Sequence, residues 1–226
     1  FVQEMFDRIA PRYDFLNRLL SLRQDVVWRR KMVASAGLEP GAKVLDVACG
    51  TCDVSLEIHH QLSGKADILG LDFSHGMLRL GLKKLMENGT PTIRLINGDA
   101  LALPFGPGLF NAVFIAFGIR NIMDRKGALT AFHHVLKPAG RAVVLELTTP
   151  EKGLLRSLYL LYFQKILPLI GSFFSRHSRA YSYLPESVLN FPTAREFAGI
   201  MKQAGFKKIR HRRMTFGIVT LFVGEK

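Results

Sequence analysis

Three aspartates stand at the ends of short apolar runs, where parallel strands commonly present ligand-binding groups. Asp46 lies near the end of the run 44–47, Asp72 closes the run 68–72, and Asp99 follows the run 92–96. A loop of small residues, 48–52, separates the first run from a helix-like stretch. Such a loop lets a ligand approach backbone N–H groups at a helix N-terminus. The pattern predicts a nucleotide or cofactor site surrounded by carboxylates.

The spacing within this stretch narrows the choice of cofactor. Asp72 stands 22 positions after Gly50, the distance at which an acid normally accepts hydrogen bonds from ribose hydroxyls. Dinucleotide oxidoreductases and S-adenosylmethionine (SAM) methyltransferases share this layout. The dinucleotide fingerprint needs three glycines, but Ala48 and Asp53 occupy the outer two positions. A carboxylate at the third position would repel a pyrophosphate.

SAM has no phosphate and carries a positive sulfonium, so acids at the strand ends suit it. The expected arrangement places Asp46 close to the sulfonium end, Asp72 on the ribose and Asp99 near the adenine. The sequence therefore favours SAM over a dinucleotide.

The elements that position these residues alternate between strand and helix. The expected strands are 44–47, 66–71, 92–96, 111–116 and 141–147, and the expected helices between and after them are 53–62, 75–87, 125–136 and 193–204. This alternation predicts a parallel, doubly wound α/β sheet that binds ligands at the carboxyl ends of its strands. Two further strands, 206–214 and 216–223, form a closing hairpin around Gly217, which makes seven strands with the last one antiparallel.

Composition sets the broad class of the protein. The chain has 226 residues, of which 48% are hydrophobic and 22% charged, and this is typical of a single globular domain. Two cysteines argue for a reducing cytosol rather than a disulfide scaffold, and no signal peptide is visible. The net charge of +13 attracts nucleic acid, anionic lipid or acidic substrates, unless it serves solubility alone.

Two segments flank the alternating core. Residues 1–40 are expected to form an N-terminal helical cap, in which Tyr13 and Asn17 are either ligand contacts or ordinary surface residues. Residues 151–185 are expected to form an apolar helical lid. Lys165 and Pro168 argue against a membrane-spanning helix there. Either the lid accepts an apolar substrate and rests on a bilayer, or its helix buries itself in its own domain.

Several blocks along the chain match a known family. They are residues 6–10, 13–14 with Asn17, Ser21 and Trp28, then 44–53, 117–121, 135–138, 183–187 and 215–219. Over nearly its whole length the chain resembles the C-methyltransferases of ubiquinone and menaquinone biosynthesis. The block 117–121, Phe-Gly-Ile-Arg-Asn, and the N-terminal block together are specific for this family.

The resemblance implies one class I SAM-dependent methyltransferase domain with a Rossmann-like fold, spanning residues 1–226 with the cap and the lid. The SAM contacts that it implies are Asp46, Gly50, Thr51, Asp72, Asp99, Ala100 and Phe117. The implied substrate is a polyprenyl quinol held by Tyr13, Asn17, Arg120 and Tyr183. Arg120 and Asn121 are the implied catalytic residues, and no metal is involved. The chain departs from the family pattern at Asp25, Cys52 and Ala116, where His, Gly and Ser are usual.

The implied reaction adds a methyl group to a ring carbon, which becomes nucleophilic when a phenol proton leaves. Arg120 follows the fourth strand, where it can bind the developing phenolate and lower its pKa. The alternative is that Arg120 belongs to a structural ion pair. No histidine lies in these loops, so the sequence assigns no conventional base.

Two other functions remain open. One is a non-catalytic SAM- or quinone-binding member of a biosynthetic complex, supported by Cys52 and Ala116. The other is a methyltransferase for another small molecule; amino-group and RNA methyltransferases usually carry Asn/Asp-Pro-Pro-aromatic where this chain has residues 116–119.

The expected partners are a lipid quinol, an anionic membrane surface and a second copy in a homodimer, with no nucleic acid. The expected location is the cytoplasm, peripheral to the inner face of the membrane. The basic run 207–213 is either a solvated edge or a lipid-facing patch.

Overall fold

The computed structural model describes residues 18, 21–150, 153–161 and 179–226. Its centre is a seven-stranded sheet in the order β3-β2-β1-β4-β5-β7-β6. The strands are β1 (Lys43–Val47), β2 (Asp67–Asp72), β3 (Arg94–Asn97), β4 (Phe110–Ala116), β5 (Leu136–Leu147), β6 (Lys207–Met214) and β7 (Val219–Glu225). Strands β1 to β5 pair in parallel, and β7 runs antiparallel to both of its neighbours. The predicted sheet and its antiparallel last strand are confirmed.

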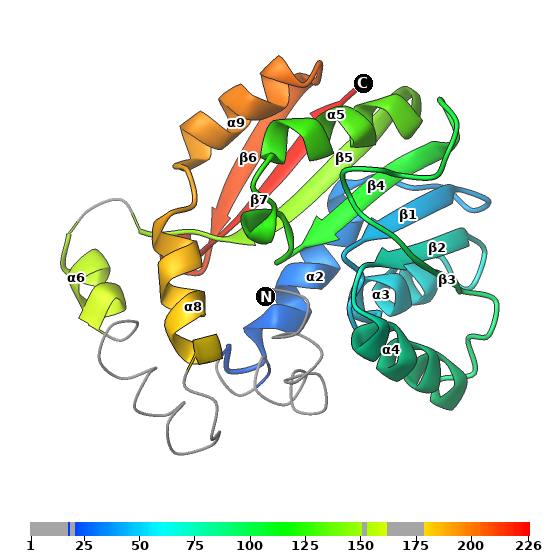
Figure 1. The fold of residues 1–226 in the computed structure, drawn as a ribbon, viewed down its shortest axis with the longest axis horizontal. Helices are drawn as coiled ribbons and strands as arrows, with labels where there is room; N and C mark the ends of the chain where they lie inside the picture. Colours follow the sequence, from blue (N-terminus) through cyan, green and yellow to red (C-terminus); the bar gives the residue numbers. More distant parts are fainter. Residues whose placement is uncertain (1–17, 19–20, 151–152, 162–178) are drawn as a thin grey trace.

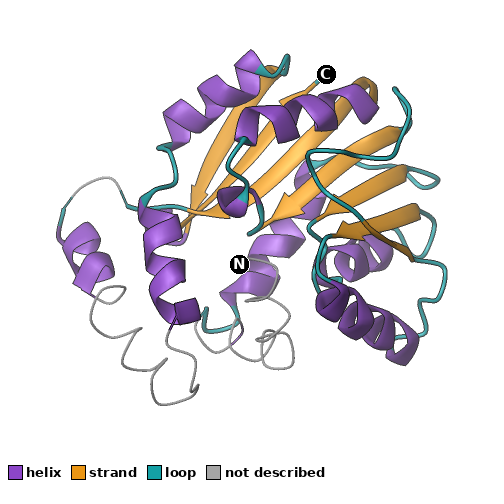
Figure 2. Ribbon diagram, viewed as in Figure 1, coloured by secondary structure: helices purple, strands orange, loops and turns teal. Residues whose placement is uncertain are grey.

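Helices cover both faces of the sheet (Figures 1 and 2). One face carries α5 (Arg125–Val135) and α9 (Ala194–Gln203), and the other carries α2 (Gln24–Ser35), α3 (Asp53–Gln61) and α4 (His75–Glu87). Because both faces are covered, the central strands are buried on both sides, which explains their nearly continuous apolar sequences.

Helix starts follow local capping chemistry. The Ser74 hydroxyl accepts a hydrogen bond from the Met77 N–H (3.1 Å) at the start of α4, and Asp124 accepts one from the Gly127 N–H (2.8 Å) at the start of α5. Thr193 begins α9 with a capping box. These interactions satisfy N–H groups that have no partner within the helix, so the helix starts lie close to where the sequence predicts them.

Most strand boundaries lie within two residues of the prediction, but the starts of β5 and β7 differ by more. Strand β5 begins at Leu136 rather than at 141, because the Lys-Pro-Ala-Gly stretch is accommodated as an irregularity opposite Phe110 and Ala112 instead of ending the strand. Strand β7 begins at Val219 rather than at 216. The preceding residues form a 3₁₀ turn, η3 (Thr215–Gly217), whose three residues all have positive φ.

The start of α2 and the described helices of the lid lie toward the carboxyl ends of the parallel strands (Figure 1). The described part of the cap is α2, whose residues Trp28, Met32 and Val33 pack against the sheet. The described helices of the lid are α6 (Leu154–Leu161) and α8 (Arg179–Leu189), and Tyr159 of α6 packs with Val188 of α8. Helix α8 continues past the predicted end of the lid and contains Pro185. Residues 162–178 of the lid and 1–17 of the cap lie outside the described residues. Among the helices that are described, none has the length and hydropathy needed to cross a bilayer.

Candidate active site

The loop between β1 and α3 has an open, backbone-lined surface. Gly50 adopts a left-handed φ of +54°, and no atom lies within 4 Å of the place where its Cβ would stand. Its N–H donates to Asp72 Oδ2 (2.8 Å), and Asp72 Oδ1 accepts from the Ser74 N–H (2.8 Å). These bonds fasten the loop to the end of β2. Gly50, Thr51 and Asp72, three of the predicted SAM contacts, therefore lie together at this loop.

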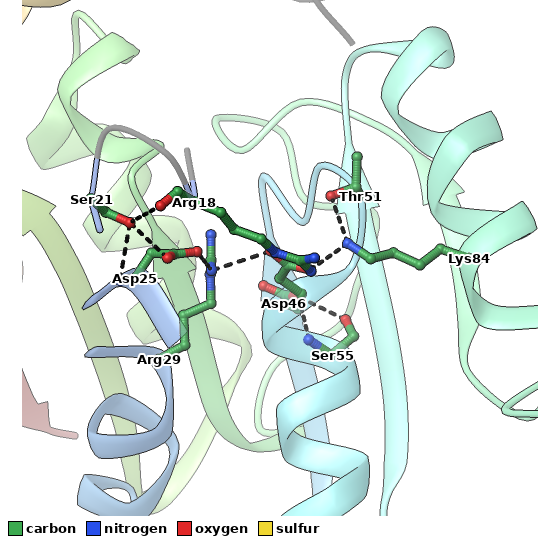
Figure 3. A network of polar contacts seen from close by, with 9 residues as sticks. Arg18, Ser21, Asp25, Arg29, Asp46, Thr51, Ser55 and Lys84 are labelled. Atoms are coloured by element: carbon green, nitrogen blue, oxygen red, sulfur yellow. Dashed lines mark hydrogen bonds and ion pairs between the residues drawn. The ribbon is translucent and has the colours of Figure 1, made fainter. Parts of the chain in front are cut away.

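Asp46 lies beneath the same loop and is completely buried. Its Oδ2 accepts hydrogen bonds from the Ser55 N–H (3.1 Å) and hydroxyl (2.6 Å) on α3 (Figure 3). Its Oδ1 is buried without a hydrogen-bond partner in the described part of the chain. Burial raises the pKa of Asp46 to about 7, despite the hydrogen bonds from Ser55. The site thus contains a buried acceptor that a bound cation would stabilise in its charged form.

A chain of alternating charges ties three helices to the loop (Figure 3). Asp53, the first residue of α3, pairs with Arg29 of α2 (3.2 Å) and with Lys84 of α4. Arg29 also pairs with Asp25 one turn earlier (2.7 Å), and Lys84 donates to the Thr51 hydroxyl (3.3 Å). Although burial acts against it, the charges of Arg29 and Lys84 lower the pKa of Asp53. Asp53, whose carboxylate makes the loop unsuitable for a pyrophosphate, thus helps to hold the loop in position.

Arg120 lies in the 3₁₀ turn η1 (Ile119–Asn121) and pairs with Glu146 near the end of β5. The Nη1–Oε1 distance is 2.9 Å, and both side chains are buried. The Arg120 backbone N–H also donates to Glu146 Oε2 (3.1 Å), and Nη1 donates to the Phe117 carbonyl. Arg120 therefore does belong to a structural ion pair, which was the alternative to a catalytic role in the sequence analysis. Arg120 Nε is buried without a hydrogen-bond partner among the described residues.

Asn121 and Tyr183 come together from distant parts of the chain. The Tyr183 hydroxyl of α8 donates to Asn121 Oδ1 at 3.0 Å. Burial is the main cause that raises the pKa of Tyr183, against the opposing charge of Arg120. The phenol therefore stays protonated near neutral pH and acts as a donor. This bond joins α8 to the turn that carries Arg120.

Three further predicted residues, Asp99, Ala100 and Phe117, follow the carboxyl ends of β3 and β4. Asp99 is exposed, and its Oδ1 accepts from the Leu101 N–H (2.9 Å), while Ala100 is half-buried. Phe117 has a left-handed φ of 57°, and its ring lies 6.2 Å from the Trp28 ring, centroid to centroid, with the Arg29 guanidinium 5.8 Å from its centroid. Tyr13 and Asn17 lie outside the described residues. No group of three potential metal ligands occurs among the residues that are described.

Comparison with known proteins decides the family. The profile of the ubiE/COQ5 methyltransferase family matches residues 1–226. The chain belongs to this family. A ubiquinone/menaquinone biosynthesis C-methyltransferase UbiE from Geotalea uraniireducens is 50% identical, covering 100% of this chain and 96% of the relative. A demethylmenaquinone methyltransferase from Thermus thermophilus is 44% identical, covering 98% of this chain and 100% of the relative.

Solved structures of lower similarity share the fold of this ubiE/COQ5 family member. A SAM-dependent methyltransferase from Aquifex aeolicus has a TM-score of 0.65 at 16% identity and covers 87% of this chain and 88% of its own. A SAM-dependent methyltransferase from Thermotoga maritima, described as a possible histamine N-methyltransferase, has a TM-score of 0.68 at 17% identity and covers 100% of both chains. The predicted class I methyltransferase fold is confirmed.

SAM is the cofactor of this ubiE/COQ5 family member, and the residues present fit it. The open space above Gly50 leaves room for a ligand against the backbone, and the buried Oδ1 of Asp46 suits a cationic one. The carboxylate of Asp72 at the end of β2 suits ribose hydroxyls. When bound, SAM supplies an electrophilic methyl group carried by a positively charged sulfur.

Two of the three departures from the usual family pattern, Cys52 and Asp25, make defined local contacts, and nothing in the structure explains Ala116. Cys52 has a φ of 70°, a conformation that favours glycine, which accounts for the usual residue there. Its side chain is fully buried and packs against Gly81 of α4, where an added Cβ would lie only 2.7 Å from the sulfur. Cys52 therefore points into the helix packing below the loop. Asp25 pairs with Arg29 and accepts a hydrogen bond from the Ser21 hydroxyl (2.7 Å).

Sequence reasoning missed three side chains of this site: Arg29, Lys84 and Glu146. The four-residue spacing of Asp25 and Arg29 was a usable signal for one ion pair. Nothing in the local sequence predicts the pairing of Asp53 with Arg29 and Lys84, or of Arg120 with Glu146, because these contacts depend on how separate elements pack.

Proposed function

We propose that this protein methylates a ring carbon of a polyprenyl quinol in menaquinone or ubiquinone biosynthesis, with SAM as the methyl donor. The observation that carries this proposal is similarity over the whole chain to relatives that bear these names, at 50% and 44% identity. The grouping of a loop that fits SAM with Arg120, Asn121 and Tyr183 at one end of the sheet supports it.

In this proposal the residues beyond β4 bind the quinol. A ring carbon attacks an electrophilic methyl group only after a phenol proton leaves and negative charge spreads into the ring. The unpaired Nε–H of Arg120 donates to the developing phenolate, and Glu146 holds the guanidinium in place. Since Glu146 balances the charge of Arg120, the directed N–H contributes more than the net charge.

Asn121 and Tyr183 serve a different purpose in the same proposal. Their hydrogen bond holds α8 against η1 and so places the lid beside the quinol ring. Because Tyr183 stays protonated, it cannot accept the phenol proton, and we assign that proton to solvent. Tyr13 and Asn17 remain proposed substrate contacts.

The test is turnover of the full chain with SAM and a short-tailed demethylated quinol, kept reduced and followed by mass spectrometry of the product. Methylation on a ring carbon of a naphthoquinol or a benzoquinol supports the proposal and identifies the ring. Binding of SAM without methylation of either ring would favour the non-catalytic alternative, and methylation of an amine or RNA would replace the proposed substrate.

We further propose that the protein works in the cytoplasm at the inner face of the membrane, because its substrate carries a lipid tail. A homodimer is also proposed, and sedimentation equilibrium of the full chain tests it directly.

A further inference from the structure

The turn η3 at the end of the β6–β7 hairpin holds an aromatic ring in solvent. Thr215, Phe216 and Gly217 have φ values of 46°, 58° and 90°, and the Phe216 side chain is 81% exposed. Left-handed backbone costs about 1–2 kcal/mol for each residue other than glycine. A large apolar side chain in water gains nothing in return within the isolated protein. Strain combined with exposure points to a contact made outside the chain.

The turn is fixed from both sides. Trp28 Nε1 of α2 donates to the Thr215 hydroxyl (2.8 Å), and the Thr148 hydroxyl donates to the Gly217 carbonyl (2.9 Å). The Thr148 N–H donates to the Ile218 carbonyl (2.8 Å). These bonds arrive from α2 and from the segment after β5, so Phe216 stands on a rigid support rather than on a loose loop.

A second apolar tip lies at the start of the helix that supports the first one. Leu22 is 81% exposed and, like Arg23 after it, has positive φ. Val27 of α2 is also exposed and immediately precedes Trp28, which bonds to η3. The exposed apolar side chains Leu22, Val27 and Phe216 thus belong to two neighbouring parts of the fold, the N-terminal end of α2 and η3, which Trp28 connects.

Two exposed arginines stand at the start of α2 and on β6, the strand that leads into η3. Arg23 is exposed beside Leu22, and Arg212 is exposed on β6. Arg212 shares a sheet face with Met214, which is buried in the cluster around Trp28, so Arg212 lies on the side of the sheet that α2 covers. Strand β6 contains no acidic residue, and the acid of α2, Asp25, is buried and paired.

We propose that Leu22, Arg23, Val27, Arg212 and Phe216, hereafter the tip surface, dock the protein on an anionic lipid bilayer. The apolar side chains enter the boundary between headgroups and acyl chains, and the arginines meet lipid phosphates. Charge alone does not carry this inference, because basic side chains commonly protect an edge strand such as β6. The apolar tips among the charges require a partner that is both apolar and anionic. The inference rests on the peripheral location proposed above and names its surface.

The test is flotation of the full chain with vesicles of phosphatidylcholine, with and without phosphatidylglycerol, at low and high salt. We expect flotation with the anionic vesicles that decreases as salt increases. Phe216→Ser should reduce the apparent partition coefficient about tenfold, since it removes a large apolar side chain from the boundary. Arg212→Gln should weaken binding to anionic vesicles and leave binding to neutral ones unchanged.

Met86→Ser on α4 is the matched control, because Met86 is 64% exposed and lies outside the tip surface. Equal flotation of the wild type, Phe216→Ser and Met86→Ser would overturn the proposal. So would a change from dimer to monomer in Phe216→Ser with vesicle binding intact, since the occupant would then be a second copy.

Methylation of a short-tailed, water-soluble quinol separates this inference from the proposed function. Phe216→Ser should methylate that quinol at the wild-type rate. Loss of flotation with unchanged turnover is the result expected for this variant, and it tests the tip surface alone. If the wild type floats with vesicles but methylates no quinol, the tip surface is supported and the proposed quinol methylation is not.

Discussion

The Tyr183 hydroxyl donates a hydrogen bond of 3.0 Å to Asn121 Oδ1 and so joins α8, the last helix of the lid, to the turn after β4. We expect Tyr183→Phe to raise KM for the quinol and lower kcat by up to about tenfold, the effect of losing one hydrogen bond of roughly 0.5–1.5 kcal/mol. SAM affinity, measured by calorimetry, should not change.

A double-mutant cycle with Asn121→Ala tests this coupling. If the bond acts as described, the double variant should be no slower than the slower single variant. Additive losses in kcat/KM would show that the two side chains act separately.

A second prediction concerns the carboxylate at the end of β2. Asp72→Asn should weaken SAM binding by roughly 1.5–3 kcal/mol, the range for hydrogen bonds to a charged group. Asparagine is preferable to alanine here, because Asp72 also accepts N–H bonds from Gly50 and Ser74, and its side-chain oxygen preserves one of these. Calorimetry on the folded variant measures the change, and undiminished affinity would remove Asp72 from the ribose site.

The sequence predicts most of the fold because the information is local. Covered parallel strands have nearly continuous apolar sequences, and capping residues such as Ser74 mark helix starts, so β1 to β4 and α4 lie close to their predicted positions. Strand β5 is the exception. The Pro138–Gly140 stretch normally ends an element, but here it is absorbed as an irregularity against β4.

Some features of the candidate site can likewise be predicted from local sequence, and others cannot. The positions of Asp46 and Asp72 at strand ends follow from the strand pattern. The partners of Arg120 and Asp53 do not, since Glu146 is 26 residues away from Arg120 and Lys84 is 31 residues away from Asp53. Such pairs form only when β4 meets β5 and when α3 meets α4, and a single sequence does not show which charged side chains will meet.

The third prediction tests whether Arg120 donates a hydrogen bond to the substrate or only balances the charge of Glu146. Arg120→Lys keeps a positive charge beside Glu146 but lacks the Nε–H donor. If Arg120 donates to the phenolate, kcat should fall about tenfold or more with SAM affinity unchanged, because the lost bond involves a charged group. If Arg120 only balances Glu146, lysine should restore kcat.

The control for Arg120 concerns stability. Arg120→Met would leave Glu146 buried and unpaired, which typically destabilises a protein by about 3–5 kcal/mol. Combining it with Glu146→Gln removes both charges. Recovery of stability without recovery of kcat would confirm that the donor acts on the substrate.

The fourth prediction concerns Cys52. Its sulfur packs against Gly81 below the loop, so Cys52→Gly should leave SAM affinity unchanged. Glycine relieves the left-handed backbone, worth about 1–2 kcal/mol, and the lost buried side chain offsets part of this gain. Calorimetry and denaturant unfolding measure the two effects. A clear change in SAM affinity with unchanged unfolding would give the thiol a role in the cofactor site.

The final prediction is a pH dependence that originates at Asp46. Burial raises its pKa from the ordinary value of 3.8 to about 7. Without cofactor, the folded protein therefore binds a proton that the unfolded chain releases between these values. The contribution of Asp46 to stability is fully present below pH 3.8 and is lost as the pH rises through about 7. Urea unfolding of the cofactor-free protein should thus show a free energy that falls between pH 5 and pH 8 in the wild type and falls less in Asp46→Asn, which cannot ionise there. Parallel curves for the two proteins would show that Asp46 does not titrate in this range.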